Sequence, residues 1–310
     1  MLDTDAEHFR EHGWVLVPEL IPADHIAAAQ AKLFDLYPTA DEVASRIRTE
    51  RTAPFLDADV TSGTWGTGDR CFVPGQFVGL KAAPFGDRAL DVLPLHDAIL
   101  DLVGALLGTD DVLLYQAETF AKYTGTAPYA QPLHIDETNH SLVPPRQDGS
   151  YRQVHLFLYL SDVTEERGAT RVVSRQVTGD IANERWYFQN SGAHRFDDDE
   201  VAAVGPAGSV LAYAADTVHR GADMTEPGAG RFFFNLGFRQ AGVDWAGDFP
   251  WPRRGIEPAV HEWIQQLTPR QLSAIGFPSP GHAYWNAETL AATAARYPDL
   301  DLTEYTTACR

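Results

Sequence analysis

Sulfur is scarce in this sequence. Its 310 residues include two cysteines, Cys71 and Cys309, and two methionines, and no CxxC pair occurs. A disulfide framework or a cysteine-based zinc site needs more thiols at closer spacing. The sequence therefore predicts neither of them, and a reducing, cytoplasmic setting fits it best.

Long apolar stretches are missing too. No run reaches the roughly 18 consecutive apolar residues that a membrane-spanning helix needs. Residues 1–13 are acidic and helix-like, whereas a secretory signal begins with a basic segment followed by an apolar one. We expect neither a membrane partner nor a secretion signal.

Positive charge is in short supply. Lys and Arg number 24 against 43 Asp and Glu, which gives a net charge of −19 and an isoelectric point near 4.8. Nucleic-acid binding draws its affinity from clustered Lys and Arg, so nucleic acid and anionic membranes are poor partners. A small anionic molecule stays possible, because a local basic pocket can override the overall negative field.

The order of predicted elements points to a mainly β protein with flanking helices. Apolar residues make up 44% of the chain, enough for one large domain or two small ones, and no linker-like boundary stands out. We therefore favour a single domain over residues 1–310. Gly, Pro and aromatic residues crowd residues 52–90 without clear periodicity, which indicates a binding loop or lid.

Hydrophobic periodicity and turn signals give the element boundaries. Helices are predicted at residues 1–13 (with a capping box from Thr4 to Glu7), 22–37 (with Pro22 in the first turn), 96–107, 261–267 and 287–296. Strands are predicted at residues 14–17, 112–123, 154–160, 170–173, 209–214 and 231–239. Helices followed by a run of strands suggest an antiparallel β-core at about 108–240, helices and a lid in 1–107, and a helical wrap in 241–310.

His134-Ile-Asp136 is the first candidate for chemistry. In an extended segment, side chains two residues apart point to the same side and can reach one ion. With 11 histidines in the chain, however, a His-x-Asp pair is expected about once by chance. Alone, the pair is a weak sign of a metal site.

His219 and Arg231 strengthen this candidate. His219 follows the predicted strand at 209–214, and Arg231 opens the next strand twelve residues later. The residues between them, 223–230, contain Pro and Gly and predict a hairpin turn. A hairpin brings the end of one strand close to the start of the next, so both side chains can line one cavity.

Two imidazoles and one carboxylate on one face of an octahedral ion favour non-haem Fe(II) and leave three positions open. A 2-oxo acid can take two of them through its carboxylate and keto oxygens, which leaves one for dioxygen. The far carboxylate of 2-oxoglutarate then needs a buried cation, and the planar fork of an arginine suits that role. If His219 were not placed so close in the sequence, we would interpret Arg231 as a sheet residue that forms an ion pair.

Several ordered motifs together resemble the phytanoyl-CoA dioxygenase family. They are Gln-Pro-Leu-His-Ile-Asp136, Leu-Ser-Asp-Val-Thr-Glu-Glu-Arg-Gly-Ala-Thr170, Pro-Ala-Gly-Ser-Val-Leu211, His219 with Arg231, and the opening His-Phe-Arg-Glu-His-Gly-Trp-Val-Leu-Val17. The resemblance implies a double-stranded β-helix (a jelly roll, cupin-like) with iron on His134, Asp136 and His219. It also implies that Gln116 and Phe157 line the co-substrate pocket, with His155 as a neighbour on the same face.

Two comparisons with the family pattern bear on specificity. After Thr170 the family usually has a Pro-Gly-Ser-His turn, whereas this chain reads Val-Ser174-Arg175-Gln176, so the substrate cannot be copied from a relative. Asp136 is retained, which leaves no ligand position for chloride and argues against a halogenase.

The function expected from these patterns is hydroxylation of a small-molecule metabolite by Fe(II), 2-oxoglutarate and O2, with succinate and CO2 as co-products. His140, Arg175 and Trp186 are candidates for substrate contacts; Arg70 and Lys122 would suit an anionic substrate. Desaturation, cyclisation or epimerisation on the same scaffold stays open, as does the oligomeric state. A zinc-dependent hydrolase and a non-catalytic jelly-roll binding protein are the competing classes, but neither needs a cation placed for a second carboxylate.

Overall fold

Two antiparallel sheets form the centre of the protein in the computed structural model, which describes residues 2–49, 77–83, 85–125, 130–146, 148–179, 195–247, 264–269, 272 and 276–309. The larger sheet has the strand order β1-β7-β4-β9-β3-β2 and the smaller β6-β5-β8. The strands of the larger sheet are β1 (Trp14–Val17), β2 (Phe77–Ala82), β3 (Val112–Tyr123), β4 (Gln153–Tyr159), β7 (Val210–Ala214) and β9 (Gly230–Gln240). Those of the smaller sheet are β5 (Arg171–Val173), β6 (Glu200–Ala202) and β8 (His219–Arg220).

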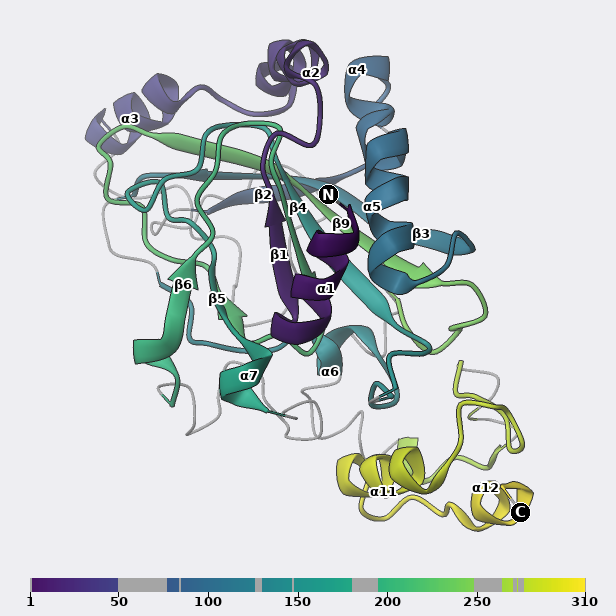
Figure 1. Cartoon of the computed structure of the whole chain (residues 1–310). Helices are drawn as coiled ribbons and strands as arrows, with labels where there is room; N and C mark the ends of the chain where they lie inside the picture. The colour runs from purple at the N-terminus through teal and green to yellow at the C-terminus, as the bar shows by residue number, and fades with distance from the viewer. Residues whose placement is uncertain are drawn as a thin grey trace.

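Helices surround these sheets (Figure 1). They are α1 (Leu2–His12), α2 (Ala23–Leu36), α3 (Ala40–Thr49), α4 (Arg88–Asp91), α5 (Asp97–Leu107), α6 (Glu137–His140), α7 (Arg175–Thr178), α11 (Ala287–Arg296) and α12 (Thr303–Ala308), with 3-10 turns at Leu93–Leu95 and Asp197–Asp199. No helix in the described ranges is long and apolar enough to cross a membrane.

The larger sheet has two chemically distinct faces, because successive side chains of a strand point to opposite sides. On β9, Phe232, Phe234, Leu236 and Phe238 are buried in the main hydrophobic core together with residues of α2 and α5. The alternate residues of β9 point the other way, and Phe233 packs there with aromatic residues of neighbouring strands. The first face holds the helices, so the second is left to line the space between the sheets.

Most predicted elements are confirmed to within two residues, including β3, α5 and α11. Strand β1 pairs with β7, and β2 pairs with β3, so the larger sheet takes in two strands from outside residues 108–240. The short strands β6 and β8 and the short helix α12 were not predicted, since two- or three-residue strands and a six-residue helix carry little periodicity. The ten-residue helix α3 was missed as well, and so was β2, which lies within the predicted lid at residues 52–90.

Four local predictions were wrong. Residues 223–230 do not form a hairpin turn, because β8 pairs with β5 in the smaller sheet and β9 pairs with β3 and β4 in the larger one. Helix α1 starts at Leu2, so Thr4 and Glu7 lie inside it and form no capping box. Pro22 is the N-cap residue of α2 and does not lie in the first turn. Asp136 has helical dihedrals (φ −88°, ψ −13°) at the start of α6, so His134 and Asp136 do not share one extended strand.

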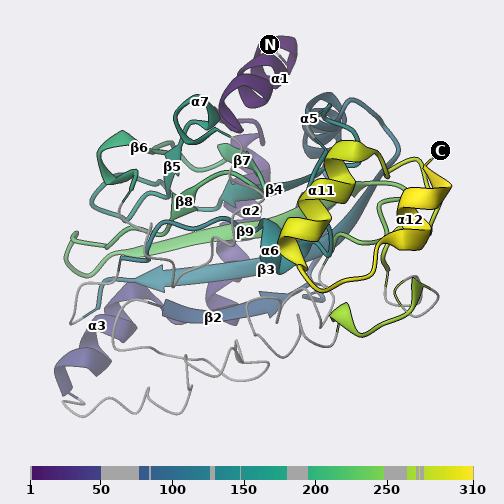
Figure 2. The same ribbon diagram turned by 90° about the horizontal axis from the view of Figure 1, so that it is seen from below.

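The C-terminal residues form a separate hydrophobic cluster with the segment that follows Asp136. Leu142 and Val143 pack there with Trp245, Tyr284 and Trp285. Figure 2 shows α11 and α12 beside the edge of the sheets, on the side where α6 lies. C-terminal residues therefore pack on the segment that follows a candidate metal ligand.

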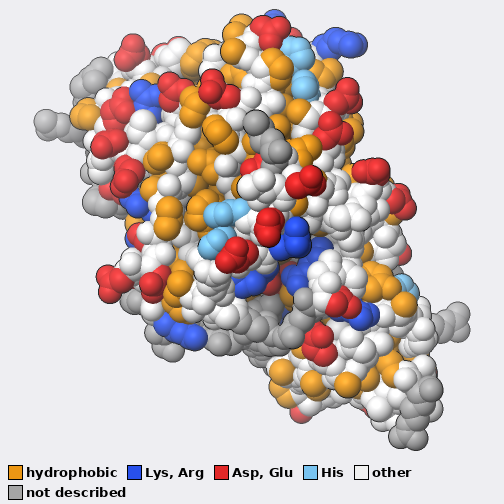
Figure 3. All heavy atoms as spheres, viewed as in Figure 1, with side chains coloured by type: hydrophobic (Ala, Val, Ile, Leu, Met, Phe, Trp, Pro, Cys, Tyr) orange, Lys and Arg blue, Asp and Glu red, His pale blue; other side chains and the backbone are white. Residues whose placement is uncertain are grey.

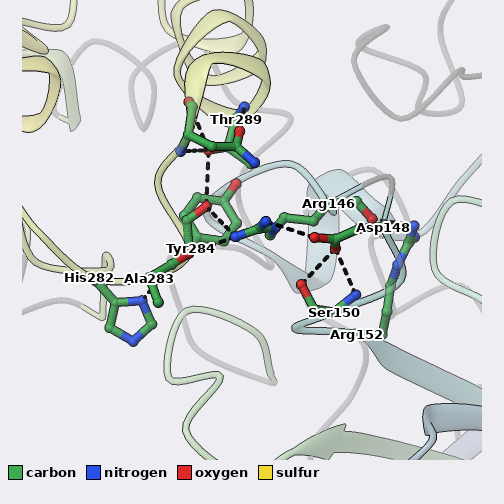
Figure 4. A network of polar contacts seen from close by, with 9 residues as sticks. Arg146, Asp148, Ser150, Arg152, His282, Ala283, Tyr284 and Thr289 are labelled. Carbon is green, nitrogen blue, oxygen red and sulfur yellow. Dashed lines mark hydrogen bonds and ion pairs between the residues drawn. The ribbon is translucent and has the colours of Figure 1, made fainter. Parts of the chain in front are cut away.

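Polar contacts also join the C-terminal segment to the loop between α6 and β4, as Figure 4 shows. The Arg146 guanidinium donates to the carbonyl oxygens of Ala283 (2.6 Å) and Tyr284 (3.3 Å), and it pairs with the Asp148 carboxylate at 2.7 Å. Asp148 in turn accepts from the backbone and hydroxyl of Ser150. Backbone atoms of the C-terminal segment are thus fixed by a side chain from the loop between α6 and β4.

Candidate metal and co-substrate site

His134 and His219 lie opposite each other as an isolated antiparallel bridge. Each backbone N–H donates to the carbonyl of the other residue at 2.9 Å, and the two ring centroids are 4.4 Å apart. The Nδ1 atoms lie 2.9 Å from the carbonyls of Pro132 and Thr217, two residues upstream in each case. Such a bond holds the proton on Nδ1 and leaves the Nε2 lone pair of each ring free for a metal ion.

Asp136 completes a cluster with the two imidazoles. Its Oδ1 lies 3.8 Å from His134 Nε2 and its Oδ2 lies 3.5 Å from His219 Nε2. The Tyr213 hydroxyl donates to Oδ2 at 3.1 Å. As the first residue before α6, Asp136 makes no side-chain cap bond to that helix, so its carboxylate is turned to the histidines instead.

This cluster has the donor set of a metal site. One ligand atom from each of His134, Asp136 and His219 lies within 4.8 Å of the others. Metal–nitrogen bonds of about 2.1 Å place neighbouring donors about 3 Å apart on an octahedral ion, so small side-chain shifts would close the cluster on one ion. Burial lowers the pKa of His134 to about 4, with the His219 ring adding to the effect. His134 is therefore neutral at pH 7, as a ligand must be.

The carboxylate of Asp136 is held in its ionised form. Burial opposes ionisation, but the imidazoles of His219, His155 and His134 outweigh it and keep the Asp136 pKa below its usual range. Burial also raises the pKa of Tyr213 well above its ordinary value, so this phenol stays a proton donor to Asp136. A charged carboxylate beside imidazole nitrogens favours a cation in the cluster.

A second group of polar side chains lies on the other side of Asp136. Asp136, His140 and His155 also bring ligand atoms within 4.8 Å of one another, and the two rings are 4.6 Å apart. The Tyr115 hydroxyl lies 3.2 Å from His155 Nε2 and donates to Gln153 at 2.9 Å. Sequence reasoning missed Tyr115, Gln153 and Tyr213. Gln153 alternates with His155 and Phe157 on β4, whereas Tyr115 lies at a register shift in β3 that alternation does not predict.

Arg231 opens β9 on the inward face. Its side chain is buried, its guanidinium donates to the carbonyl of Gly168, and it lies 5.1 Å from the centre of the Phe233 ring. Its Nε has no hydrogen-bond partner, and no carboxylate of the described residues forms an ion pair with it. Burial lowers its pKa to about 10, so it remains a cation at pH 7. An orphaned N–H on a buried guanidinium fits an anionic ligand.

The other predicted site residues fall in three places. Gln116 and Phe157 lie on the inward face: the Gln116 Oε1 is buried without a partner, and Phe157 packs 4.6 Å from Phe233. Arg175 opens α7, where it pairs with Asp216 at 2.9 Å and donates to the carbonyl of Arg10. Those contacts tie α1 to the turn before β8. Trp186 lies outside the described residues, as do Arg70 and most of the predicted lid.

Comparison with known proteins decides the family. The family model described as Phytanoyl-CoA dioxygenase (PhyH) matches residues 9–228, which is more than half of the chain. The chain belongs to the phytanoyl-CoA dioxygenase family. The expected jelly-roll core is thereby confirmed, with its two facing antiparallel sheets, while no curated protein matches the chain.

Solved structures similar to this PhyH-family chain include enzymes of several reaction types. The epimerase SnoN, in complex with Fe3+, alpha-ketoglutarate and nogalamycin RO, is 21% identical, covers 77% of this chain and 84% of its own, and has a TM-score of 0.51. The carbocyclase SnoK from nogalamycin biosynthesis is 17% identical over 80% of this chain and 87% of its own (TM-score 0.52). HygX from Streptomyces hygroscopicus, with nickel and 2-oxoglutarate bound, is 14% identical over 77% and 87% (TM-score 0.50). At this identity the likeness concerns the fold.

Proposed function

We propose that this protein is an Fe(II)- and 2-oxoglutarate-dependent oxygenase that hydroxylates a small-molecule metabolite. In this proposal His134, Asp136 and His219 bind the metal, and Arg231 binds the distal carboxylate of 2-oxoglutarate. The observation that carries it is the pairing of a His-Asp-His cluster with a buried, partly unsatisfied guanidinium on adjoining elements. A zinc-dependent hydrolase or a non-catalytic jelly-roll binding protein has no need for that guanidinium.

The chain's own residues would bind, orient and shield the reactants. When bound, the iron supplies the activation of dioxygen that side chains cannot perform. The Nδ1 contacts of His134 and His219 fix the direction of their rings, and the Tyr213 hydroxyl fixes Asp136. The aromatic rings of Phe120, Phe157 and Phe233 pack together on the inward face, which would keep bulk water from the co-substrate.

The reaction that follows oxygen activation depends on how the substrate is placed. Hydroxylation is the outcome we favour, and epimerisation, cyclisation or desaturation are the alternatives on the same scaffold. SnoN and SnoK, which share the fold, are named as an epimerase and a carbocyclase. His140 and His155, beside Asp136, are the described residues that we expect nearest to the substrate.

Anaerobic titration tests the co-substrate assignment. Addition of 2-oxoglutarate to the Fe(II)-loaded protein should produce the weak visible charge-transfer band of a chelated 2-oxo acid. Under oxygen, a panel of metabolites should then stimulate the release of succinate. Absence of both the band and succinate formation would exclude the oxygenase.

A single substitution tests the metal ligands. Asp136→Ala should abolish the charge-transfer band and turnover, because the remaining imidazoles bind iron weakly without the carboxylate. Asp35→Ala serves as the matched control, since the side chain of Asp35 is 76% exposed on α2. Equal activity of the Asp136 variant and the wild type would refute the ligand assignment.

A further inference from the structure

Asp216 lies in the turn between β7 and β8, where two arginines from different parts of the chain pair with it. Arg175, the first residue of α7, lies 2.9 Å from its Oδ1, and Arg152, just before β4, lies 3.5 Å from its Oδ2. Burial opposes ionisation of Asp216, but Arg175 and Arg152 outweigh it and keep its pKa below the ordinary value. A charged carboxylate thus joins three segments of the chain at this turn.

The same turn is bound to the segment that follows the N-terminal helix. The Thr217 hydroxyl and the backbone N–H of Ala214 both donate to the carbonyl of Gly13, at 2.6 and 2.8 Å. Gly13 has a φ of +81°, and a Cβ there would lie 2.8 Å from the Thr217 Oγ1, so this close approach requires glycine. The Arg175 guanidinium also donates to the carbonyl of Arg10 at 3.3 Å. The ion cluster and the end of α1 therefore hold the turn together.

Two carbonyls of this turn, on either side of Asp216 in the sequence, contact candidate metal ligands. The carbonyl of Ala215 accepts from the backbone N–H of Asp136 at 2.9 Å. The carbonyl of Thr217 lies 2.9 Å from Nδ1 of His219. Groups that hold a ligand in this way set its direction and the affinity of the metal site. The position of one turn thus bears on two ligands that come from different segments.

We propose that Asp216 is a positioning residue of the metal centre, which acts by fixing this turn between Arg152 and Arg175. The assignment rests on the metal site proposed above and adds to it a residue that is not itself a ligand. It also gives Arg175 a role other than the substrate contact suggested by the sequence, because its guanidinium binds Asp216 and the end of α1. The charge of a carboxylate outside the ligand set then affects how tightly the metal binds.

Metal titrations of the full-length protein test the assignment. Asp216→Asn keeps the size of the side chain and removes its charge, which weakens the pairing with both arginines. The affinity for Co(II), measured by competition with a chelator, should fall about 10-fold, the lower end of the range for loss of a group that orients a ligand. The visible absorption bands of bound Co(II) should also change, because they report the geometry of the ligands. A loss of stability alone leaves those bands unaltered.

A pair of substitutions at Arg175 tests the role of the charge. Arg175→Lys keeps a cation beside Asp216, whereas Arg175→Met removes it. The lysine variant should therefore bind Co(II) more tightly than the methionine variant and show bands closer to those of the wild type. Equal affinities and equal spectra of the two variants would contradict the proposal, and this comparison decides the question if Asp216→Asn does not fold.

Glu226→Gln is the matched control, since it removes the charge of another carboxylate that pairs with an arginine, Arg167, at 2.7 Å. Thermal unfolding of the metal-free variants measures any general loss of stability. Wild-type affinity and an unchanged Co(II) spectrum in Asp216→Asn would overturn the proposal, and so would a loss of affinity no larger than that of the control. Failure of the wild type to bind Co(II) at all would instead refute the metal site itself.

Discussion

At the scale of single residues, Tyr213 contacts two of the three candidate metal ligands. It donates to Asp136, its ring lies 4.6 Å from that of His219, and it stacks 5.5 Å from His155. One side chain thus contacts both a carboxylate and an imidazole of the cluster. Groups that hold metal ligands in this way tune the affinity of the site.

Tyr213→Phe should therefore weaken metal binding. Loss of a partner that orients a ligand costs about 10- to 100-fold in metal affinity, and we expect a loss in this range for Fe(II) or Co(II) measured by competition with a chelator. Tyr159→Phe is the control, because the Tyr159 hydroxyl donates to the carbonyl of Ala203 at 2.7 Å, away from the cluster. Equal metal affinity of Tyr213→Phe and the wild type would show that Asp136 is aligned without it.

At the scale of elements, helix α11 fixes the segment that begins with Asp136. Arg296, at the end of α11, is 2% exposed, donates to the carbonyl of Ser141 at 3.1 Å and lies 3.9 Å from the Glu137 carboxylate. The Tyr297 hydroxyl donates to the carbonyl of Leu142 at 2.8 Å. Burial raises the pKa of Glu137 to about 7, although Arg296 opposes the shift. The first residue after the candidate ligand is thus held by the C-terminal helix.

Arg296→Met should destabilise the protein more than an ordinary surface change does. Removing one partner of a buried charged pair costs about 3–5 kcal/mol, and we expect a loss at the lower end of this range in denaturant unfolding. Arg171→Met is the control: its partner Glu165 is 62% exposed, so that ion pair contributes about 1 kcal/mol or less. A loss no larger than that of the control would mean that α11 does not fix this segment.

At the scale of the whole molecule, charge is distributed unevenly. The net charge is −19, and Figure 3 shows Asp and Glu side chains over much of the visible face with a group of Lys and Arg side chains near its centre. Inside the fold, Arg231 and Lys122 are buried basic side chains, and Arg152 and Arg175 both pair with Asp216. Basic side chains are thus grouped locally although the overall charge is negative, which is compatible with the anionic co-substrate proposed above.

Metal binding should raise the stability of the entire domain, because a ligand that binds the native state alone shifts the unfolding equilibrium. At a metal concentration about 100 times the dissociation constant, the gain is about 2.7 kcal/mol. Thermal unfolding with Ni(II) or Co(II), which stand in for iron without its oxidation, measures this as a rise in Tm. Asp136→Ala should show no rise, and a wild-type Tm insensitive to either metal would contradict the proposed site.

The sequence could predict what depends on local order and spacing. The alternation along β9 was predictable from its sequence, and the turn residue Gly108 ended α5 as expected. The predicted hairpin between His219 and Arg231 does not form, because β8 pairs with β5 whereas β9 pairs with β3 and β4. The sequence also located β3, which carries both Gln116 and Lys122. The features that it predicted follow from the two-residue period of strands and from the backbone preferences of glycine, which neighbours in sequence express without help from the rest of the fold.

The tertiary structure alone decided which distant residues meet. Tyr213 reaches Asp136 across 77 positions, and Lys122 faces Arg231 because β3 and β9 pair in one particular register. Asp136 itself lies at the start of α6, held by a backbone bond to Ala215, and not in the extended dipeptide that the His-x-Asp spacing suggested. Strand register and the burial of charges are set by the packing of whole sheets, so no local pattern could specify them.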